Sequence, residues 1–573
     1  MAPGWSRSSA SGHGATGRAE VYLIRAVRPA WLAPPALLFA LPLAAALPVA
    51  AWQGLSAAAW GALINDPQLP RALALSLGTA LVSTLVSLVL ALWLVTQLHG
   101  TRAFERLARA LGPMLAVPHA AFAIGLALLV MPAGVLARLL ALPLGYDAPP
   151  DWPTLNDPRG FALVLVLVAK ETPFLLWNVV ALLARPELGL QLRAWLASGR
   201  TLGYSDAAIW WRVLWPLLLP RLAWPVLAVL AYGLTVVDLA LIVGPASPPT
   251  LAVIAWQWLQ DDNAGRNAEG AAAALLLAGV LALLVAALAL TARALQRLWA
   301  RHACNGQRSR RAGTRPLPAY LARLGPLVLY SLLALYATVA LLLAMSSLTG
   351  VWTFPSLLPQ SWTEAAWTQV AASLGTLGLS AWLGVVASVG ALALALLWFE
   401  ATPPAWDQRV MPLVLAPLVV PSLLLMVGFY TLALSARLDG TLPGLAWVHL
   451  ISALPYVFVA LAPAWRSFDV RYEQTALALG RSRAAFFWRI KLPLLAAPMA
   501  AALAVGFAVS VAQYLPTQFI GAGRHATVTT EAVTLASGGQ RHTAAAFALL
   551  QALLPLIGFG VAAAVGRRQR RTS

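Results

Sequence analysis

The sequence predicts an all-α integral membrane protein with about 12 transmembrane helices in two tandem, parallel halves. Of its 573 residues, 60% are hydrophobic and only 10% are charged, whereas soluble proteins carry about 25% charged residues. Apolar segments of about 20 residues, the length a helix needs to cross a hydrocarbon core of ~30 Å, recur along the whole chain. Two similar polar segments, offset by 277 residues, indicate an internal duplication.

The predicted spans fall into two sets of six. Their limits divide the chain into a cytoplasmic N-terminal tail (1–30), a first half (31–292), a basic cytoplasmic linker (293–323), a second half (324–566) and a basic cytoplasmic tail (567–573). The first apolar run exceeds the 7–15 residues of a signal-peptide core, so we expect it to be retained. The spans lie near 31–52, 72–97, 112–135, 161–183, 218–243 and 271–292, then near 326–345, 370–398, 411–434, 446–463, 494–520 and 544–565.

Charge predicts the orientation of these spans. The net charge of +19 resides in short runs between apolar segments, which does not favour nucleic-acid binding. Short cytoplasmic loops of membrane proteins hold the excess of Arg and Lys. The basic segments and the acidic loops around Asp66, Asp147 and Asp261 alternate along the chain. We therefore expect a multi-pass protein of the cell inner membrane with both termini in the cytoplasm.

The two similar polar segments, 197–220 and 474–498, are named here the first and second islands. Gly is the usual left-handed residue just after a helix, and Ser is a good N-cap for the next one. Each island therefore predicts helix, sharp turn, helix, with a proline where the chain returns to the membrane. The residues that match are Gly203 and Gly480, Ser205 and Ser482, Trp211 and Trp488, Arg212 and Arg489, and Pro216 and Pro493.

Aromatic residues beside arginine in both islands predict a protein-binding surface, because aromatics and Arg are the usual anchors of protein–protein hot spots. The aromatic candidates are Trp210 and Trp211 in the first island and Phe487 and Trp488 in the second.

A second repeated motif widens the duplication. Ser-Leu-Gly-Thr at 76–79 matches the same letters at 373–376, an offset of 297. The longer offset predicts about 20 extra residues in the first half, most simply in the outer loop around 146–159. Because six spans precede the linker, the halves share one orientation.

The spacing within the islands resembles the EAA loop in inner-membrane permeases of binding-protein-dependent ABC importers. That loop has Gly, nine residues, an aliphatic residue, one residue, a Leu-like residue and Pro. Gly480, Ile490, Leu492 and Pro493 fit it fully; Gly203, Val213 and Pro216 fit the first copy, with Trp215 in the Leu position. The family's leading Glu-Ala-Ala is replaced by Ala-Ser-Gly at 197–199 and by Gln-Thr-Ala at 474–476.

A single chain that carries both halves is similar to the fused permeases of ferric-iron and thiamine importers. The resemblance implies a type I importer-like permease that forms the solute pathway and takes solute from a periplasmic binding protein. It also implies that each loop docks on a separate ATPase subunit, two copies in all, which would hold ATP and Mg. We expect no cofactor in this chain itself.

The chain is not expected to be an enzyme. A phosphate-binding loop needs G-x-x-x-x-G-K-[ST], and the only lysines, Lys170 and Lys491, follow Ala169 and Ile490. The seven histidines have no metal-ligand spacing, and Cys304 stands alone, so no metal site is expected. A membrane enzyme is therefore the least favoured class.

Charges within the predicted spans have two interpretations. Lys170 and Glu171 lie in the fourth span and Asp238 in the fifth, where a charge costs about 2.5–3.5 kcal/mol at the bilayer centre. We favour Lys170 neutralising Glu171 or Asp238, since buried charges are usually paired.

The alternative is a translocation pathway for a cation such as ferric iron or thiamine, with Trp177 offering a cation–π contact. A polyamine or an oxyanion also remains open as the substrate. The same three charges could instead serve a secondary transporter driven by an ion gradient, although such a carrier gives no reason for the paired islands.

Overall fold

A computed structural model describes residues 29–303 and 319–572. The predicted N-terminal tail up to residue 28 and the middle of the predicted linker, including Cys304, lie outside the described residues. Helix α15 runs to Ala303, α16 begins at Ala319 and α28 reaches Thr572. The ends of the predicted linker and most of the predicted C-terminal tail are therefore helical.

The described residues form helices joined by loops, with one isolated β-bridge between Thr349 and Trp362. The first half contains α1 (Pro29–Pro35), η1 (Ala36–Ala40), α2 (Leu41–Gly54), α3 (Ala57–Asn65), α4 (Leu69–Leu98), α5 (Arg102–Ala116), α6 (His119–Val130), α7 (Val135–Leu144), α8 (Phe161–Leu183), α9 (Pro186–Thr201), α10 (Asp206–Ile209), η2 (Trp210–Leu214), α11 (Trp215–Leu218), η3 (Leu219–Leu222), α12 (Ala223–Thr235), α13 (Asp238–Val243), α14 (Leu251–Leu259) and α15 (Ala264–Ala303). The second half contains α16 (Ala319–Ser347), α17 (Ala365–Ala372), α18 (Leu374–Ala401), α19 (Ala405–Val419), α20 (Ser422–Ser435), α21 (Leu442–Arg466), α22 (Arg471–Ala478), α23 (Arg483–Phe486), η4 (Phe487–Lys491), α24 (Leu492–Leu494), α25 (Ala496–Val511), α26 (Leu515–Gly521), α27 (Val528–Ser537) and α28 (Arg541–Thr572).

Ten helices of the described chain are long and apolar enough to cross a membrane, or up to 12 if two sharply bent pairs each count as one span. This confirms an all-α membrane protein. Both bent pairs lie in the second half: α19 with α20, at 100°, and α23–α24 with α25, at 71°.

The predicted spans at 112–135 and 411–434 are not continuous helices. Helix α5 ends before Val117-Pro118, and α19 ends before Val420-Pro421. The residue before a proline is disfavoured in the α conformation, and both valines are extended, with ψ of 119° and 135°. Each span therefore breaks at the same Val-Pro pair.

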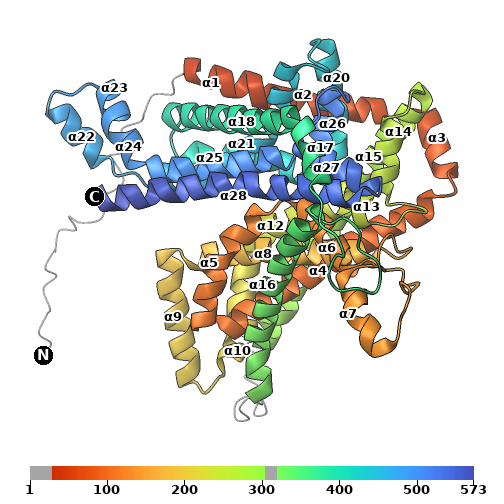
Figure 1. Ribbon diagram of the computed structural model, residues 1–573. Helices are drawn as coiled ribbons and strands as arrows, with labels where there is room; N and C mark the ends of the chain where they lie inside the picture. Colours follow the sequence, from red (N-terminus) through yellow and green to blue (C-terminus); the bar gives the residue numbers. More distant parts are fainter. Residues whose placement is uncertain (1–28, 304–318, 573) are drawn as a thin grey trace, which may run out of the picture.

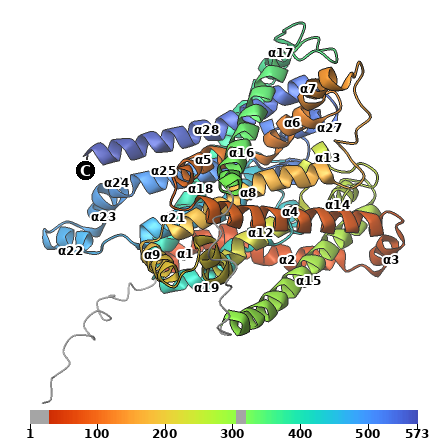
Figure 2. The ribbon, with the colours of Figure 1, turned by 90° about the horizontal axis from the view of Figure 1, so that it is seen from below.

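Both islands lie at one end of the helical bundle. In Figures 1 and 2, α9 lies on the same side as α22, α23, α24 and the C-terminus, while α3, α7 and α14 lie at the opposite side. The acidic loops around Asp66, Asp147 and Asp261 adjoin α3, α7 and α14. The basic islands and the acidic loops are thus separated along the bundle, as the alternation of charge predicts.

The first long helix of each half packs against the other half. Helix α2 lies on α20, and α16 lies on α6. A glycine makes each approach close: a Cβ on Gly125 of α6 would come within 2.6 Å of Val339 Cγ1, and one on Gly428 of α20 would clash with the backbone oxygen of Ala46. The two halves are therefore interlocked by exchanged helices.

The structure corrects the register of the second repeat. Ser76 Oγ accepts a hydrogen bond from Leu251 N, 2.9 Å, at the start of α14, and Ser380 Oγ accepts one from Val528 N, 2.8 Å, at the start of α27. The counterpart of Ser76 is therefore Ser380 rather than Ser373, which precedes α18. The error is seven residues, close to two helical turns, so both registers present small residues to nearly the same face.

The extra residues of the first half lie where the sequence predicts them. The connection between α6 and α8 spans 131–160 and includes α7, whereas that between α20 and α21 spans only 436–441. Arg138 of α7 is 4% exposed and donates hydrogen bonds to four backbone oxygens, three of them in the outer loop after α16. The insertion therefore joins the first half to the loop that follows α16 of the second half.

Candidate functional site

Both islands have the predicted helix–turn–helix geometry. Gly203 and Gly480 adopt φ of +82° and +75°, in the left-handed region that favours glycine. The Ser205 hydroxyl accepts a hydrogen bond from Ala208 N, 3.3 Å, and Ser482 accepts one from Ala485 N, 3.2 Å. The predicted roles of these glycines and serines in the backbone are confirmed.

The second short helix of each island continues into a π-helical turn, Trp210–Leu214 or Phe487–Lys491. Pro216 and Pro493 lie in the first turn of the helices that follow, where a missing N–H is tolerated. Such π turns are rare and often occur at functional sites. The two islands thus share an unusual local backbone as well as a sequence pattern.

Residues that match between the islands form the same exposed surface. Leu202 and Leu479 are 63% and 75% exposed, and Trp211 and Trp488 are 39% and 68% exposed. Arg212 and Arg489 are exposed next to these tryptophans, and Ile490 is half-buried beside Arg489. Each island therefore exposes an apolar residue, an indole and a guanidinium at matching positions.

Trp210 does not belong to that surface. It is 1% exposed and packs between His99 and Trp215, at 5.2 Å and 4.8 Å between ring centres. Phe487 is half-buried and packs against Trp465, 6.3 Å away. These two aromatics, each the first residue of its π turn, anchor the islands to the bundle.

The floor of the first island, meaning the buried side chains by which the island contacts the helical bundle, is aromatic. Trp215 Nε1 donates a hydrogen bond to Thr96 Oγ1 at the end of α4, 2.9 Å. Burial lowers the pKa of His99, which also contacts Phe104. On the solvent side, Arg200 and Asp206 form a two-point ion pair, with both N–O distances 2.7 Å. This pair braces the turn at Gly203.

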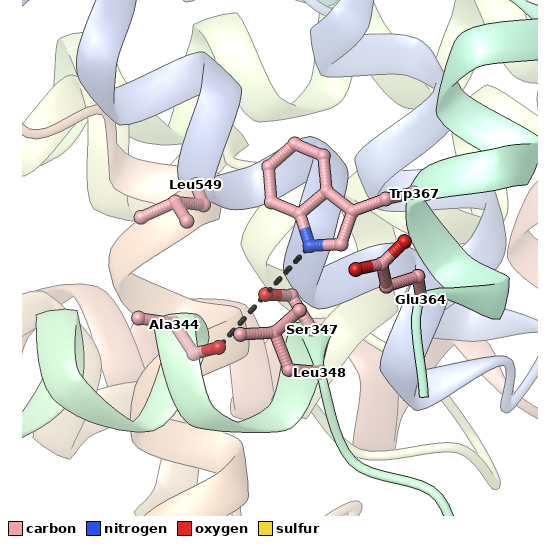
Figure 3. Close-up of a pocket in the computed structure, with 6 residues that line it drawn as sticks. All are labelled: Ala344, Ser347, Leu348, Glu364, Trp367 and Leu549. Carbon is pink, nitrogen blue, oxygen red and sulfur yellow. Dashed lines mark hydrogen bonds between the residues drawn. The ribbon is translucent and has the colours of Figure 1, made fainter. Parts of the chain in front are cut away.

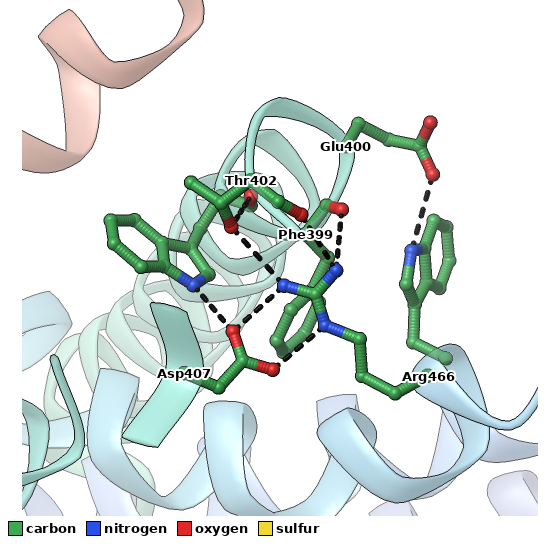
Figure 4. A network of polar contacts seen from close by, with 7 residues as sticks. Phe399, Glu400, Thr402, Asp407 and Arg466 are labelled. Carbon is green, nitrogen blue, oxygen red and sulfur yellow. Dashed lines mark hydrogen bonds and ion pairs between the residues drawn. The ribbon is translucent and has the colours of Figure 1, made fainter. Parts of the chain in front are cut away.

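Charged side chains form the floor of the second island, and Figure 4 shows the adjoining network around Arg466 and Asp407. Lys491, 5% exposed, forms an ion pair with Glu400 at the end of α18. Two residues after Glu400, just beyond the end of α18, the Thr402 carbonyl accepts a hydrogen bond from Arg466. Arg466 in turn makes a two-point ion pair with Asp407, both distances 2.7 Å. Charged side chains thus join this island to the bundle.

The charges within the spans do not pair as the sequence predicts. Lys170 Nζ donates to the backbone oxygens of Met114, 3.2 Å, and Val117, 2.7 Å. No ion pair among the described residues joins it to Glu171 or Asp238. The break at Pro118 leaves carbonyls at the end of α5 without helical partners, and the ammonium group satisfies these.

Glu171 lies beside a histidine that was not among the predicted site residues. Its Oε1 lies 3.2 Å from Nε2 of His119, the first residue of α6. Asp238, at the start of α13, lies within electrostatic range of His119. The tyrosines Tyr232, from the first half, and Tyr456, from the second, lie within electrostatic range of Glu171. A cluster of acidic and aromatic groups therefore lies between the halves.

Trp177 is not shown to join this cluster. The aromatic rings near Lys170 Nζ are those of Phe122, 5.7 Å, and Tyr336, 5.4 Å, while Trp177 is 44% exposed elsewhere on α8. The signal for His119 was its position after Pro118 in a predicted span. Tyr456 gave no signal, because its place opposite Glu171 depends on how the halves pack.

A shallow pocket of about 340 Å³ lies between the end of α16, the start of α17 and α28 (Figure 3). Trp367 Nε1 donates to Ser347 Oγ, 3.3 Å, which donates to the backbone oxygen of Ala344, 2.8 Å. Glu364 supplies its one carboxylate. The pocket contains none of the predicted site residues, and within the described chain no group of three or more His, Cys, Asp or Glu could hold a metal ion.

Comparison with known proteins places these features in context. Residues 391–571 match the family model described as binding-protein-dependent transport system inner membrane component. Over 513 residues the chain is 38% identical to the inner membrane ABC transporter permease protein YnjC of Escherichia coli (strain K12), covering 90% of this chain and 91% of that protein. The matched family segment includes the whole second island.

Proposed function

Because this chain belongs to the inner-membrane permease components of binding-protein-dependent ABC transport systems, we propose that its two islands each dock on a separate ATPase subunit and transmit ATP-driven movement to the helices. The protein is a multi-pass inner-membrane transport subunit. ATP and Mg would be held by two partner ATPase subunits. Membership of this family favours ATP-driven import over the ion-driven carrier that the sequence alone left open.

The observation that carries this proposal is the matched surface of the islands. Leu202, Trp211 and Arg212 recur as Leu479, Trp488 and Arg489, exposed in both copies and at the same end of the bundle. Two identical ATPase subunits would need two such equivalent surfaces. Aromatic side chains and Arg give the largest contributions to protein–protein affinity.

The orientation follows from the same surface. We place the islands and both termini in the cytoplasm, where ATP is present, in accord with the basic residues of the islands. The acidic loops at the opposite end, beside α3, α7 and α14, would then face a periplasmic binding protein. The division into two permease halves with a cytoplasmic linker is part of this proposal.

The solute pathway would run between the halves, past Glu171, Asp238 and His119. Glu171 is 5% exposed, and among the described residues it forms no ion pair with Lys170, whose ammonium group donates to backbone oxygens. Carboxylates beside tyrosine rings favour a cationic solute, of which ferric iron and thiamine are candidates. Trp177 stays a weaker candidate for a contact along this path.

Docking can be tested with the matched pair Trp211→Ala and Trp488→Ala, using Val470→Ala as the control. Val470 is 54% exposed and lies four residues before the second island in the sequence. It is not one of the residues that match between the islands, so it serves as the control. Loss of a hot-spot aromatic typically costs 2 kcal/mol or more, about 30-fold in affinity. We expect each tryptophan variant to lose the ATPase subunit during purification while Val470→Ala retains it. Full ATP-dependent uptake by the double variant would refute docking through the islands.

The pathway can be tested by uptake of radiolabelled thiamine, ferric iron and spermidine into proteoliposomes that hold the whole transporter. We expect Glu171→Gln and Asp238→Asn each to lower uptake of the transported cation while the ATPase subunits stay bound. Unchanged uptake in both variants would remove these carboxylates from the pathway.

A further inference from the structure

The second island is tied to the membrane helices through a buried lysine. Lys491 is 5% exposed, and its Nζ lies 4.3 Å from the Trp465 ring centre and 5.9 Å from that of Phe468. Its ion-pair partner Glu400 belongs to the last turn of α18 and also accepts a hydrogen bond from Trp465 Nε1, 3.2 Å. One carboxylate therefore joins the island, α18 and α21.

The connection continues into a third helix. Arg466, next to Trp465, makes a two-point ion pair with Asp407 of α19 and donates to the backbone oxygens of Phe399 and Thr402, at 3.0 Å and 2.8 Å (Figure 4). Trp398 Nε1 also donates to Asp407, 2.9 Å. The ends of α18, α19 and α21 are thus held by groups that have fixed, directional partners.

Among the described residues of the first half, the positions equivalent to Glu400 and Lys491 carry no charge. In the register set by Ser76 and Ser380, Glu400 corresponds to Thr96, and in the island register Lys491 corresponds to Leu214. There the island meets α4 through the neutral hydrogen bond from Trp215 to Thr96. The floor around this bond is apolar and aromatic, since Trp210, Leu214 and Trp215 are all buried.

On the basis of the proposed function, we propose that Lys491 and Glu400 are positioning residues that transmit movement of the ATPase subunit from the second island to α18, α19 and α21. Separating a buried ion pair leaves uncompensated charge, so the pair resists separation and moves as one unit. The first island moves its helices through apolar packing and one neutral hydrogen bond. The two ATPase subunits therefore drive the two halves through unequal connections.

The experiment uses the full transporter with its ATPase subunits in proteoliposomes and measures solute transported per ATP hydrolysed. The variants are Lys491→Met, Glu400→Gln and the exchange Lys491→Glu with Glu400→Lys; Thr96→Val is the matched change in the first half. The affinity of the ATPase subunit for each permease variant is measured in parallel, because docking and transmission are separate steps.

We expect each single variant to lower transport per ATP by about tenfold, a size typical of coupling between distant sites, while the affinity for the ATPase subunit stays within about twofold. The exchange is expected to restore at least half of the transport per ATP, which a purely structural loss would not allow. Normal transport per ATP in Glu400→Gln, or an equal loss in Thr96→Val, would overturn the inference. If instead the unaltered chain fails to bind an ATPase subunit, the proposed function fails.

Discussion

Arg138 offers the sharpest test of how the two halves are joined at their outer ends. Its guanidinium donates to the backbone oxygens of Thr353, 2.7 Å, Ser356, 2.6 Å, and Trp352, 3.1 Å, and stacks 4.4 Å from the Trp352 ring centre. Arg138→Met keeps most of the side-chain volume but removes every donor. The outer loop, residues 351–361, would then lose the group around which its carbonyls converge.

The magnitude follows from those contacts. An unpaired buried acceptor costs about 1–3 kcal/mol, and three loop carbonyls lose their partner together. The costs are not additive, and water can reach some of these oxygens, so we expect the loop to be destabilised by about 3 kcal/mol, the lower end of the range for breaking a buried charged contact. That corresponds to an increase of about 100-fold in the equilibrium constant for opening of the loop.

Amide hydrogen exchange of peptides covering 348–364 measures this opening directly. We expect Arg138→Met to raise exchange there by about 100-fold, and Arg138→Lys to give a smaller increase, because an ammonium group has three donors in place of five. Peptides from the islands are expected to stay unchanged. The matched control is Arg159→Met, since Arg159 is an exposed arginine in the same connection between α6 and α8. Equal protection in Arg138→Met and in the unaltered chain would refute the reasoning.

Two further predictions concern packing and pH. Gly428→Ala places a methyl group against the backbone oxygen of Ala46. We expect the free energy of unfolding to fall by about 1–3 kcal/mol, which is seen as a lower Tm. The control Gly378→Ala places its methyl group in open space and should leave Tm within error. Burial lowers the pKa of His99, so the folded state binds its proton less readily than the unfolded state, whose histidine titrates near about pH 6.5. The contribution of His99 to the stability of the first island should be complete above that pH and fall as the pH drops below it. His99→Phe should remove this part of the pH dependence of hydrogen exchange in the island. An unchanged pH profile in this variant would exclude His99 as its source.

The islands could be predicted from sequence because their conformation is set by neighbouring residues. A glycine that needs positive φ and a serine that caps the next helix act within a few positions of each other, as Gly480 and Ser482 do. The breaks at Pro118 and Pro421 carry an equally local signal, but a scan for apolar length alone passes over them. Local rules were sufficient for this part of the site.

The remaining features depend on partners far apart in the chain. The predicted partner of Lys170 was a carboxylate, yet backbone oxygens about 55 residues earlier, exposed by the break at Pro118, satisfy it. Arg138 binds main-chain oxygens more than 200 residues later, and a main-chain partner leaves no trace in side-chain pattern. The predicted match of Ser76 with Ser373, in place of Ser380, was wrong because a helix presents nearly the same face every seven residues.

The exchanged first helices have a consequence for how the protein is made. Ala46 is synthesised early, but Gly428, whose missing side chain makes room for it, leaves the ribosome nearly four hundred residues later. At about 5–20 residues per second, α2 waits for tens of seconds beside lipid before its neighbour exists. Biogenesis of the amino-terminal domain is therefore finished only once the carboxy-terminal one has been inserted, and a nascent chain arrested between them would stay incomplete.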